Sequence, residues 1–301
     1  MAEAPKLPVI DLSASDRISS ANSIRQACIE CGFFYLVNHG VDQELLAQVF
    51  EESSKFFSLP LEDKSKLARK HHRGYTSLEN LNPKSRSTGN SKETFYIGPF
   101  EDVTQSNLNQ WPSEDILPSW RPTMESYYRK IHSAGKRLIS LIALALNLDE
   151  DFFEKVDTRP TPFLRLLHYP GQLGSSDQEM YGASSHSDFG MVTLLVSNGV
   201  PGLQVCREKS KQPQVWEDVL HKDGAFIINI GNLIERWTNC LFRSTLHRVR
   251  PEGQERFSVA FFLDPNEDFM VECLASCCSE SSPPRFPPIR GGDYLKEHMA
   301  S

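Results

Sequence analysis

Apolar positions near the N-terminus follow two different periods. Residues 7–13 (LPVIDLS) and 32–41 (GFFYLVNHGV) show the alternation and the apolar runs of short β-strands. Residues 20–31 instead have the spacing of an amphipathic helix, and a second helix is predicted to begin with Asp42 as its N-terminal cap. Together these elements predict an N-terminal α/β portion over residues 1–115.

The middle of the chain contains a polar segment and then a long helix. Residues 77–92 carry few apolar side chains and no periodicity, so we expect a loop there. Loops of this length beside a core often cover an active site. A long helix is predicted to start near Pro122 and to support a sheet. Its apolar residues recur at steps of three, four and seven: Met124, Tyr128, Ile131, Leu138, Leu141 and Ala145.

The pattern changes after residue 162 to short runs rich in β-branched and aromatic residues. Turns with glycine, proline or charge separate these runs, which are PFLRLLHYP, MVTLLVS, GLQVC, PQVWEDV, GAFIINI, HRVR and RFSVAFFL. Many short strands without alternating helices favour a sandwich or barrel over a doubly wound sheet. We predict a mainly β fold with flanking α-helices and a double-stranded β-helix (jelly roll) core. Residues 116–301 would hold the long helix and the jelly roll, in one compact unit with residues 1–115.

Charge and composition narrow the possible partners. The 301 residues include 39 acidic and 32 basic side chains, and the net charge of -7 disfavours a protein that covers nucleic acid. The densest basic run, residues 64–73, is predicted to be the solvated face of a helix. The N-terminus lacks the pattern of a secretory signal, and the longest apolar stretch, residues 138–148, is too short to span a bilayer. We expect a soluble, cytoplasmic monomer with no nucleic-acid or membrane partner.

Seven cysteines, an odd number without export, indicate free thiols in a reducing compartment. Cys28 and Cys31 form a C-x-x-C motif, but they close a predicted helix instead of starting one, where the helix dipole would activate a thiol. Cys273, Cys277 and Cys278 lack a second pair at zinc-finger spacing. We interpret all seven cysteines as structural.

A histidine and an aspartate lie just before one of the predicted strands. His186 and Asp188 are two residues apart, so in extended backbone their side chains point to the same face. His247, on a later strand, can supply a third ligand. Two histidines and one carboxylate leave three positions of an octahedron open, which suits non-haem iron(II) working with O2. An H-x-D motif alone is a weak signal, because it occurs by chance in many chains.

The following predicted strand strengthens this interpretation. Arg256 and Ser258 are again two residues apart, and they share the face that His247 should reach. A guanidinium is a planar fork of donors that pairs bidentately with a carboxylate, and the serine hydroxyl adds a donor. Such a clamp would bind a dicarboxylate by the end remote from the metal.

Nearly the whole chain resembles the plant-type iron(II)/2-oxoglutarate dioxygenases related to isopenicillin N synthase, flavonoid oxygenases and hyoscyamine 6-hydroxylase. The matching stretches are LPVIDLS, GFFYLVNHGV, FFSLP, HYP, HSDFGMVTLL, GLQV, GAFIINIGN, STLHRV and RFSVAFF, in this order. The resemblance implies Fe(II), 2-oxoglutarate and O2, with ascorbate in support, and oxidation of a small metabolite of plant secondary metabolism with release of succinate and CO2. The implied metal ligands are His186, Asp188 and His247, and the implied cosubstrate contacts are Arg256, Ser258 and Tyr169.

Two positions depart from the family pattern. Leu167 stands where the family has asparagine in an Asn-Tyr-Tyr-Pro stretch, which removes a polar contact near the cosubstrate. Asn232 stands where the family usually has aspartate, which removes a charge but no metal ligand. Neither change affects the implied triad or clamp, so the resemblance still implies an active enzyme.

Substrate contacts are predicted from aromatic positions near these motifs. Phe189 follows the H-x-D motif, and Phe262 shares the face of Ser258. In the run ETFYIG, either Phe95 or Tyr96 is predicted to contact the substrate. Aromatic side chains at such positions are more often core than pocket. The remaining histidines singled out are interpreted as packing residues, His39 and His168, or as surface residues, His71 and His72.

Several reactions and two alternatives remain open. Hydroxylation is the default outcome, and demethylation, desaturation and ring closure use the same chemistry. One alternative is an iron(II) oxidase of the same fold that does not use 2-oxoglutarate, since the same arginine and serine can hold a different carboxylate. The other is a non-catalytic binding protein that has kept the fold, which an intact triad beside an intact clamp disfavours. Succinate formed in step with product would distinguish the two enzymes.

Overall fold

The computed structural model describes residues 7–77, 92–100, 108–153, 162–171, 182–250 and 253–299. The loop predicted over residues 77–92 lies outside these ranges apart from its two end residues.

An eight-stranded sheet forms the centre of the molecule, in the order β1-β2-β10-β7-β12-β5-β4-β3. Every neighbouring pair is antiparallel except β1 and β2. Strands from before and after the boundary predicted near residue 115 therefore share one sheet, and that boundary stays a prediction. The bounds are β1 Val9–Asp11, β2 Phe33–Val37, β3 Gly74–Thr76, β4 Glu93–Ile97, β5 Phe163–Tyr169, β7 Val192–Ser197, β10 Phe226–Ile230 and β12 Arg256–Leu263.

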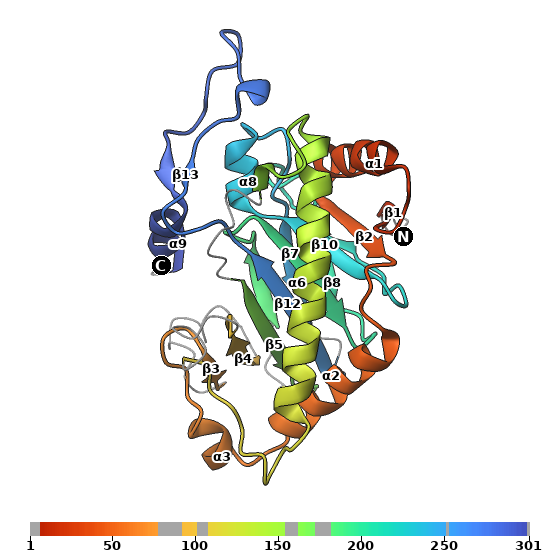
Figure 1. Ribbon diagram of the computed structural model, residues 1–301, viewed down its shortest axis with the longest axis vertical. Coiled ribbons are helices and arrows are strands. Elements are labelled where there is room, and N and C mark those ends of the chain that lie inside the picture. The colour runs from red at the N-terminus through yellow and green to blue at the C-terminus, as the bar shows by residue number, and fades with distance from the viewer. Residues whose placement is uncertain are drawn as a thin grey trace.

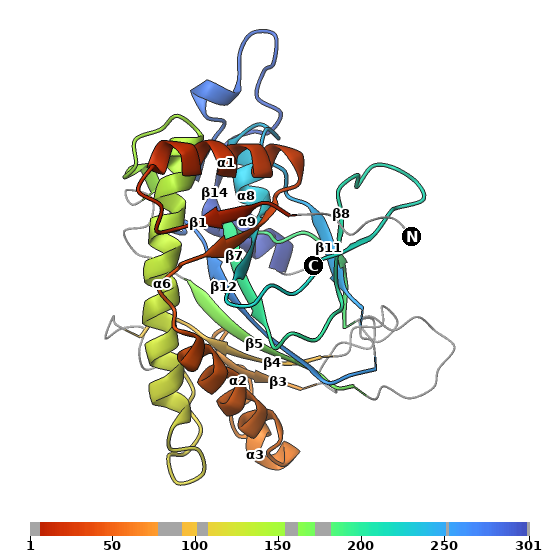
Figure 2. The ribbon, with the colours of Figure 1, turned by 90° about the vertical axis from the view of Figure 1, so that its right-hand side faces the viewer.

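A four-stranded sheet, β6-β11-β8-β9, faces the large one. Figure 2 shows β8 and β11 on one side of the large sheet and helix α6 on the other. The mainly β architecture with flanking helices and a jelly-roll core is confirmed. The bounds here are β6 Ala183–His186, β8 Leu203–Cys206, β9 Glu217–Asp218 and β11 Leu246–Val249, with a separate pair of β13 Met270–Val271 and β14 Ile289–Arg290.

The helices cover the outer face of the large sheet or lie at its ends. Helix α6, Trp120–Ala145, is the long helix that the apolar spacing predicted, and it begins two residues before Pro122. It runs from the level of α1 to the level of α2 (Figure 1). The prediction for Asp42 is wrong in one respect, because its side chain makes no capping hydrogen bond and instead pairs with Lys130 on α6. The other bounds are α1 Arg17–Glu30, α2 Gln43–Phe57, α3 Leu61–Ser65, α8 Asn232–Trp237, a 3-10 turn at Ala275–Cys277 and α9 Gly291–Met299.

Two apolar layers hold these parts together. The outer layer fills the space between the large sheet and the helices, and its largest buried side chains include Trp120 and Phe56. The inner layer lies between the sheets and includes Leu167 and Ile227. Each fully buried side chain of this size contributes about 1.5–3 kcal/mol. Because alternate residues of β12 face the two layers, its inner face presents Arg256, Ser258, Ala260 and Phe262.

The basic run at residues 64–73 is not a solvated helix face, so that prediction is wrong. Helix α3 ends at Ser65, and the chain continues through turns into β3. Lys64 is buried, and its Nζ lies 2.7 Å from the Phe57 carbonyl and 2.8 Å from Oε2 of Glu93. Arg73 is also buried. A run of charged residues does not predict whether its side chains are exposed, because a partner of opposite charge can lie on a strand distant in sequence.

Glu93 is the centre of a buried polar network behind the sheet. Its carboxylate also accepts a hydrogen bond from Tyr75, and its Oε1 lies 2.7 Å from Nδ1 of His168. Burial alone would raise the pKa of Glu93, but the bonds from His168, Lys64 and Tyr75 hold it below its usual range. The carboxylate therefore stays ionised at neutral pH. His168 also stacks on Phe257, and it is a packing residue as predicted.

Replacing Lys64 with methionine should lower the free energy of unfolding by about 3–5 kcal/mol, because Glu93 is left as a buried charge without its cation. Chemical denaturation at neutral pH measures this difference. Lys66→Met is the matched control, since Lys66 pairs with Asp63 at the exposed surface and should cost less than about 1 kcal/mol. Equal effects of the two changes would contradict a special role for the buried pair.

All seven cysteines are free, as predicted, and Cys28 and Cys31 are buried. Burial, followed by the neighbouring Cys31 thiol, raises the pKa of Cys28, which makes it a poor nucleophile.

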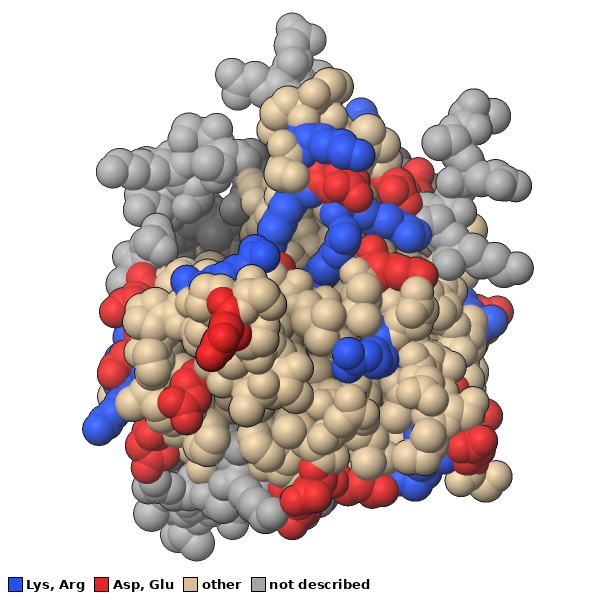
Figure 3. Space-filling view, turned by 90° about the horizontal axis from the view of Figure 1, so that it is seen from above, with Lys and Arg blue, Asp and Glu red and all other residues tan. Residues whose placement is uncertain are grey.

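Along the described ranges, no helix combines the length and the apolar character needed to cross a membrane. Seen from above (Figure 3), basic and acidic side chains are interspersed, and most of the basic ones gather in a band above a largely uncharged area.

Candidate metal centre

The predicted triad comes together at the edge of the smaller sheet. Antiparallel pairing of β6 with β11 places His247 directly opposite His186, with ring centroids 4.3 Å apart. Asp188 follows β6, and its Oδ1 lies 3.7 Å from Nε2 of His186 and 3.6 Å from Nε2 of His247. One ligand atom from each residue lies within 4.8 Å of the others. Adjacent ligands about 2.1 Å from a metal ion are about 3 Å apart, so a slight contraction would close this set around one ion.

Backbone carbonyls fix the orientation of both imidazoles. Nδ1 of His186 lies 2.7 Å from the carbonyl oxygen of Ser184, and Nδ1 of His247 lies 3.1 Å from that of Thr245. A carbonyl only accepts, so each Nδ1 carries the proton and each Nε2 presents a lone pair to the centre. This is the orientation that metal-binding histidines require.

Two polar side chains on the large sheet hold the carboxylate of Asp188. Its Oδ2 accepts hydrogen bonds from Oγ1 of Thr193 at 2.5 Å and from Nδ2 of Asn229 at 2.7 Å. Oδ1 is left to face the histidines. Sequence reasoning missed both residues, although each interrupts an otherwise apolar strand, MVTLLV and FIINI.

The first turn of α8 supports the same segment through its backbone. The backbone N–H of Asn232 donates a hydrogen bond to the backbone carbonyl of Asp188 at 2.8 Å. A Cβ on Gly231 would lie 2.1 Å from the carbonyl oxygen of Gly190, so this close approach requires glycine. Because Asn232 acts here through its backbone N–H, this support would be the same with aspartate at this position.

The ionisation states suit metal binding. Burial, followed by the repulsion of a second imidazole, lowers the pKa of His186 to about 4, so it is neutral at physiological pH. Burial would raise the pKa of Asp188, but His247, His186 and its two hydrogen bonds hold it below the usual range. The neutral imidazole of His186 and the carboxylate of Asp188 are therefore ready to bind a divalent cation without first losing a proton.

Replacing Asn229 with leucine should weaken metal affinity about 10–100-fold, because a partner that orients a ligand is lost while the ligand remains. The same range is expected for Thr193→Val. Anaerobic Fe(II) titration in competition with a chelator gives the affinity. Thr76→Val is the control, since the buried hydroxyl of Thr76 has no hydrogen-bond partner in the described part of the chain. Unchanged affinity in both test variants would show that Asp188 needs no such support.

The predicted clamp lies on the inner face of β12. Arg256 and Ser258 are each 2% exposed. Register places Arg256 opposite Tyr169, whose ring centroid is 5.2 Å from the guanidinium carbon. Its Nε donates to the carbonyl of Val200, whereas Nη1 is buried and lacks any hydrogen-bond partner among the described residues. None of the acidic side chains in those ranges pairs with it. A buried cation in this state fits an anionic ligand such as a carboxylate.

The aromatic residues predicted to contact the substrate differ in where their side chains lie. Tyr96 and Phe189 line a cavity of about 580 Å³ together with Arg69, His71, His72 and His298. His71 and His72 are exposed, as predicted. Phe262 lies on the inner face of β12 and is partly buried.

The expectation for Phe95 is wrong. Its ring is fully buried in the outer layer, with its centroid 4.9 Å from those of both Phe56 and Trp120. Adjacent residues of a strand point to opposite faces, so Tyr96 faces the cavity and Phe95 cannot.

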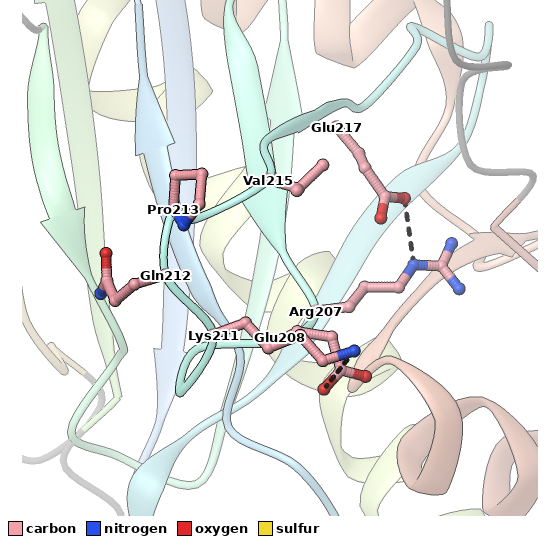
Figure 4. A pocket seen from close by; sticks show the side chains of 7 residues that line it. All are labelled: Arg207, Glu208, Lys211, Gln212, Pro213, Val215 and Glu217. Carbon is pink, nitrogen blue, oxygen red and sulfur yellow. Dashed lines mark hydrogen bonds and ion pairs between the residues drawn. The ribbon is translucent and has the colours of Figure 1, made fainter.

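A second, smaller hollow of about 290 Å³ lies near the β8–β9 connection (Figure 4). Like the larger cavity, it contains no residue of the triad or the clamp among its lining residues. Its charged groups already pair with one another, as Arg207 does with Glu217 at 3.1 Å. Its lining comprises Arg207, Glu208, Lys211, Gln212, Pro213, Val215 and Glu217.

Comparison with known proteins agrees with this geometry. The profile described as "non-haem dioxygenase in morphine synthesis N-terminal" matches residues 7–114, and that of the 2OG-Fe(II) oxygenase superfamily matches residues 160–265. Azadirone synthase LFS of Melia azedarach is 37% identical over 96% of this chain and 90% of its own length. Kihadalactone A synthase LFS of Citrus sinensis is 38% identical with the same coverage. Among solved structures, a full-length Neurospora crassa protein in complex with alpha-KG superposes with a TM-score of 0.87 at 28% identity, over 100% of this chain and 98% of that one.

Profiles, relatives and the convergence of His186, Asp188 and His247 thus agree: the chain belongs to the 2OG-Fe(II) oxygenase superfamily and is an Fe(II)- and 2-oxoglutarate-dependent dioxygenase that acts on a small molecule.

Proposed function

We propose that His186, Asp188 and His247 hold the iron and that Arg256, Ser258 and Tyr169 hold the remote carboxylate of 2-oxoglutarate. The observation that carries this assignment is the convergence of three ligand atoms within 4.8 Å, in the same interior space as a buried arginine without an acidic partner among the described residues. When bound, the iron supplies activation of O2 coupled to decarboxylation of 2-oxoglutarate to succinate and CO2.

The residues of the chain position the reactants and exclude water. Two histidines and one carboxylate would hold the iron and would leave coordination positions for the cosubstrate and O2. Arg256 anchors the cosubstrate by a charge-assisted pair, and Ser258 adds a neutral donor. Leu167, where the family has asparagine, contributes an apolar wall, so the clamp relies more heavily on Arg256 here.

The outcome is oxidation of a carbon–hydrogen bond in a small organic metabolite, with hydroxylation as the default. Tyr96, Phe189 and Phe262 offer apolar surface to the substrate, and a cavity of about 580 Å³ lies within the usual range for small-molecule sites. The two relatives named above are synthases of azadirone and kihadalactone A. By that likeness we infer a substrate from secondary metabolism, oxidised by a cytoplasmic monomer.

Anaerobic titration of the purified protein with Fe(II) and 2-oxoglutarate tests the assignment. We expect the weak visible charge-transfer absorption of the iron chelate, followed by succinate once O2 is admitted. If iron binds but neither the absorption nor succinate appears, the result would favour an iron(II) oxidase of the same fold that does not use 2-oxoglutarate.

A further inference from the structure

Two basic side chains of the barrel interior form no ion pair with any acidic residue that the structure describes. Lys92 precedes β4, and Arg165 lies in the middle of β5. Neither takes part in an ion pair within the described ranges, and Nε of Arg165 is buried without a hydrogen-bond partner there. Both side chains are only partly exposed. Interior cations are normally paired, so an unpaired couple requires a reason.

The strand register places both cations on the face that carries the clamp. Arg165 is directly opposite Tyr96 on β4 and Ala260 on β12. Ala260 stands between Ser258 and Phe262 on the inner face. Glu93 pairs with His168, so Lys92, one residue earlier, lies at the level of Tyr169.

Burial and neighbouring charges both act on the ammonium of Lys92. Burial, followed by the charge of Arg165, lowers the pKa of Lys92 to about 7, and Asp188 is the acid that opposes the shift. The ammonium is thus desolvated beside another cation, and a nearby anion would stabilise its charged form.

The charge balance of the loaded site leaves these two cations unsatisfied. Iron(II) and Arg256 are together balanced by Asp188 and the two carboxylates of 2-oxoglutarate. Asp188 is then committed to the metal, and no other acidic side chain of the described ranges forms an ion pair with Lys92 or Arg165. A further anion beside Lys92 and Arg165 would complete the site.

Tyr96, which lines the cavity of about 580 Å³, supplies aromatic surface next to Arg165. The ring of Tyr96 lies 4.8 Å from the guanidinium carbon of Arg165 and 4.1 Å from that of Arg69. Phe189 closes another part of the wall and contacts His298 of α9. A ligand that matches this wall has an apolar skeleton and a negatively charged end.

We propose that Lys92 and Arg165 bind a carboxylate of the primary substrate, which is therefore a small organic acid with an apolar skeleton. This inference rests on the proposed function, because it takes the Fe(II)·2-oxoglutarate complex as the species that binds the acid.

Matched acids and esters test the inference. The anaerobic Fe(II)·2-oxoglutarate protein is titrated with 3-phenylpropionate, 4-phenylbutyrate and octanoate, and with the methyl ester of each. Binding is followed by calorimetry and by the change in the charge-transfer absorption. The variants are Lys92→Met and Arg165→Met. Lys136→Met, an exposed position on α6, is the control with the same loss of charge.

We expect the acids to bind about 10-fold or more tightly than their esters, as for a hydrogen-bonded charge pair. Each test variant should lose most of this preference and keep its affinity for 2-oxoglutarate within about 3-fold, which corresponds to less than one neutral hydrogen bond. The control should behave as the unmodified protein.

Three results would overturn the inference: no acid binds, esters bind as well as acids, or the variants lose 2-oxoglutarate instead of the acid preference. The last would assign Lys92 and Arg165 to the cosubstrate. A control without any added acid or ester separates these failures from failure of the proposed function. The charge-transfer absorption and succinate formation do not require the acid, so both should still be observed if the proposed function is correct.

Discussion

Replacing Asp188 with alanine is expected to weaken iron binding more than about 100-fold and to abolish succinate formation. Loss of an outer partner of a ligand costs about 10–100-fold, so loss of the ligand itself should exceed that range. The carboxylate is also the only negative charge in the triad, and without it two neutral imidazoles face a divalent cation. The variant should therefore fail at metal loading and not at a later step.

The measurement is anaerobic Fe(II) titration, followed by O2 consumption and succinate assays with excess iron. Thr193 and Asn229 lose their shared acceptor in this variant, which costs about 1–3 kcal/mol of stability for each unsatisfied group. Asp188→Asn is therefore tested beside it, because an amide keeps the size of the side chain. Asp115→Ala, at an exposed position, is the control. Full turnover in a folded Asp188 variant would remove this residue from the metal site.

Replacing Arg256 with glutamine is expected to raise the KM for 2-oxoglutarate about 30-fold or more and to leave Fe(II) affinity nearly unchanged. Removing one partner of a buried, hydrogen-bonded charge pair costs about 2–5 kcal/mol. The folded protein without cosubstrate should not suffer, because Arg256 is a buried cation whose pKa is already lowered by burial and which lacks an acidic partner among the described residues.

Graded variants separate charge from geometry at the clamp. Arg256→Lys keeps the charge but loses the planar fork, so its effect should be smaller than that of glutamine. Ser258→Ala removes one neutral donor and should raise the KM by about 2-fold to 12-fold. A KM for 2-oxoglutarate that stays constant through all three variants would place the cosubstrate elsewhere.

Local periodicity was sufficient for much of the candidate site. The two-residue spacing of His186 and Asp188, and again of Arg256 and Ser258, predicts a shared face because side chains alternate along any extended strand. The long amphipathic helix and the many short β-rich runs predicted a jelly roll with flanking helices for similar reasons. These are properties of single elements, so one sequence carries them.

Periodicity failed where both faces of a strand are buried. In β4, helices cover one face and the barrel interior lies on the other, so ETFYIG shows no polar side that would identify the direction of each residue. Phe95 and Tyr96 were therefore indistinguishable, although one lies in the outer layer and the other lines the cavity. Lys64 was misassigned for a related reason, since its partner Glu93 lies 29 residues later.

The sequence by itself determined the donor set, the order of the strands along the chain and the pairing of residue types with iron and a dicarboxylate. Only the tertiary structure decided which strands are neighbours, because hydrogen-bonded pairing joins segments far apart in the chain. That pairing sets His247 opposite His186, brings Thr193 and Asn229 to Asp188, and leaves Arg165 beside Tyr96 at the cavity. A contact between distant residues depends on the packing of the whole sheet, and no local pattern encodes it.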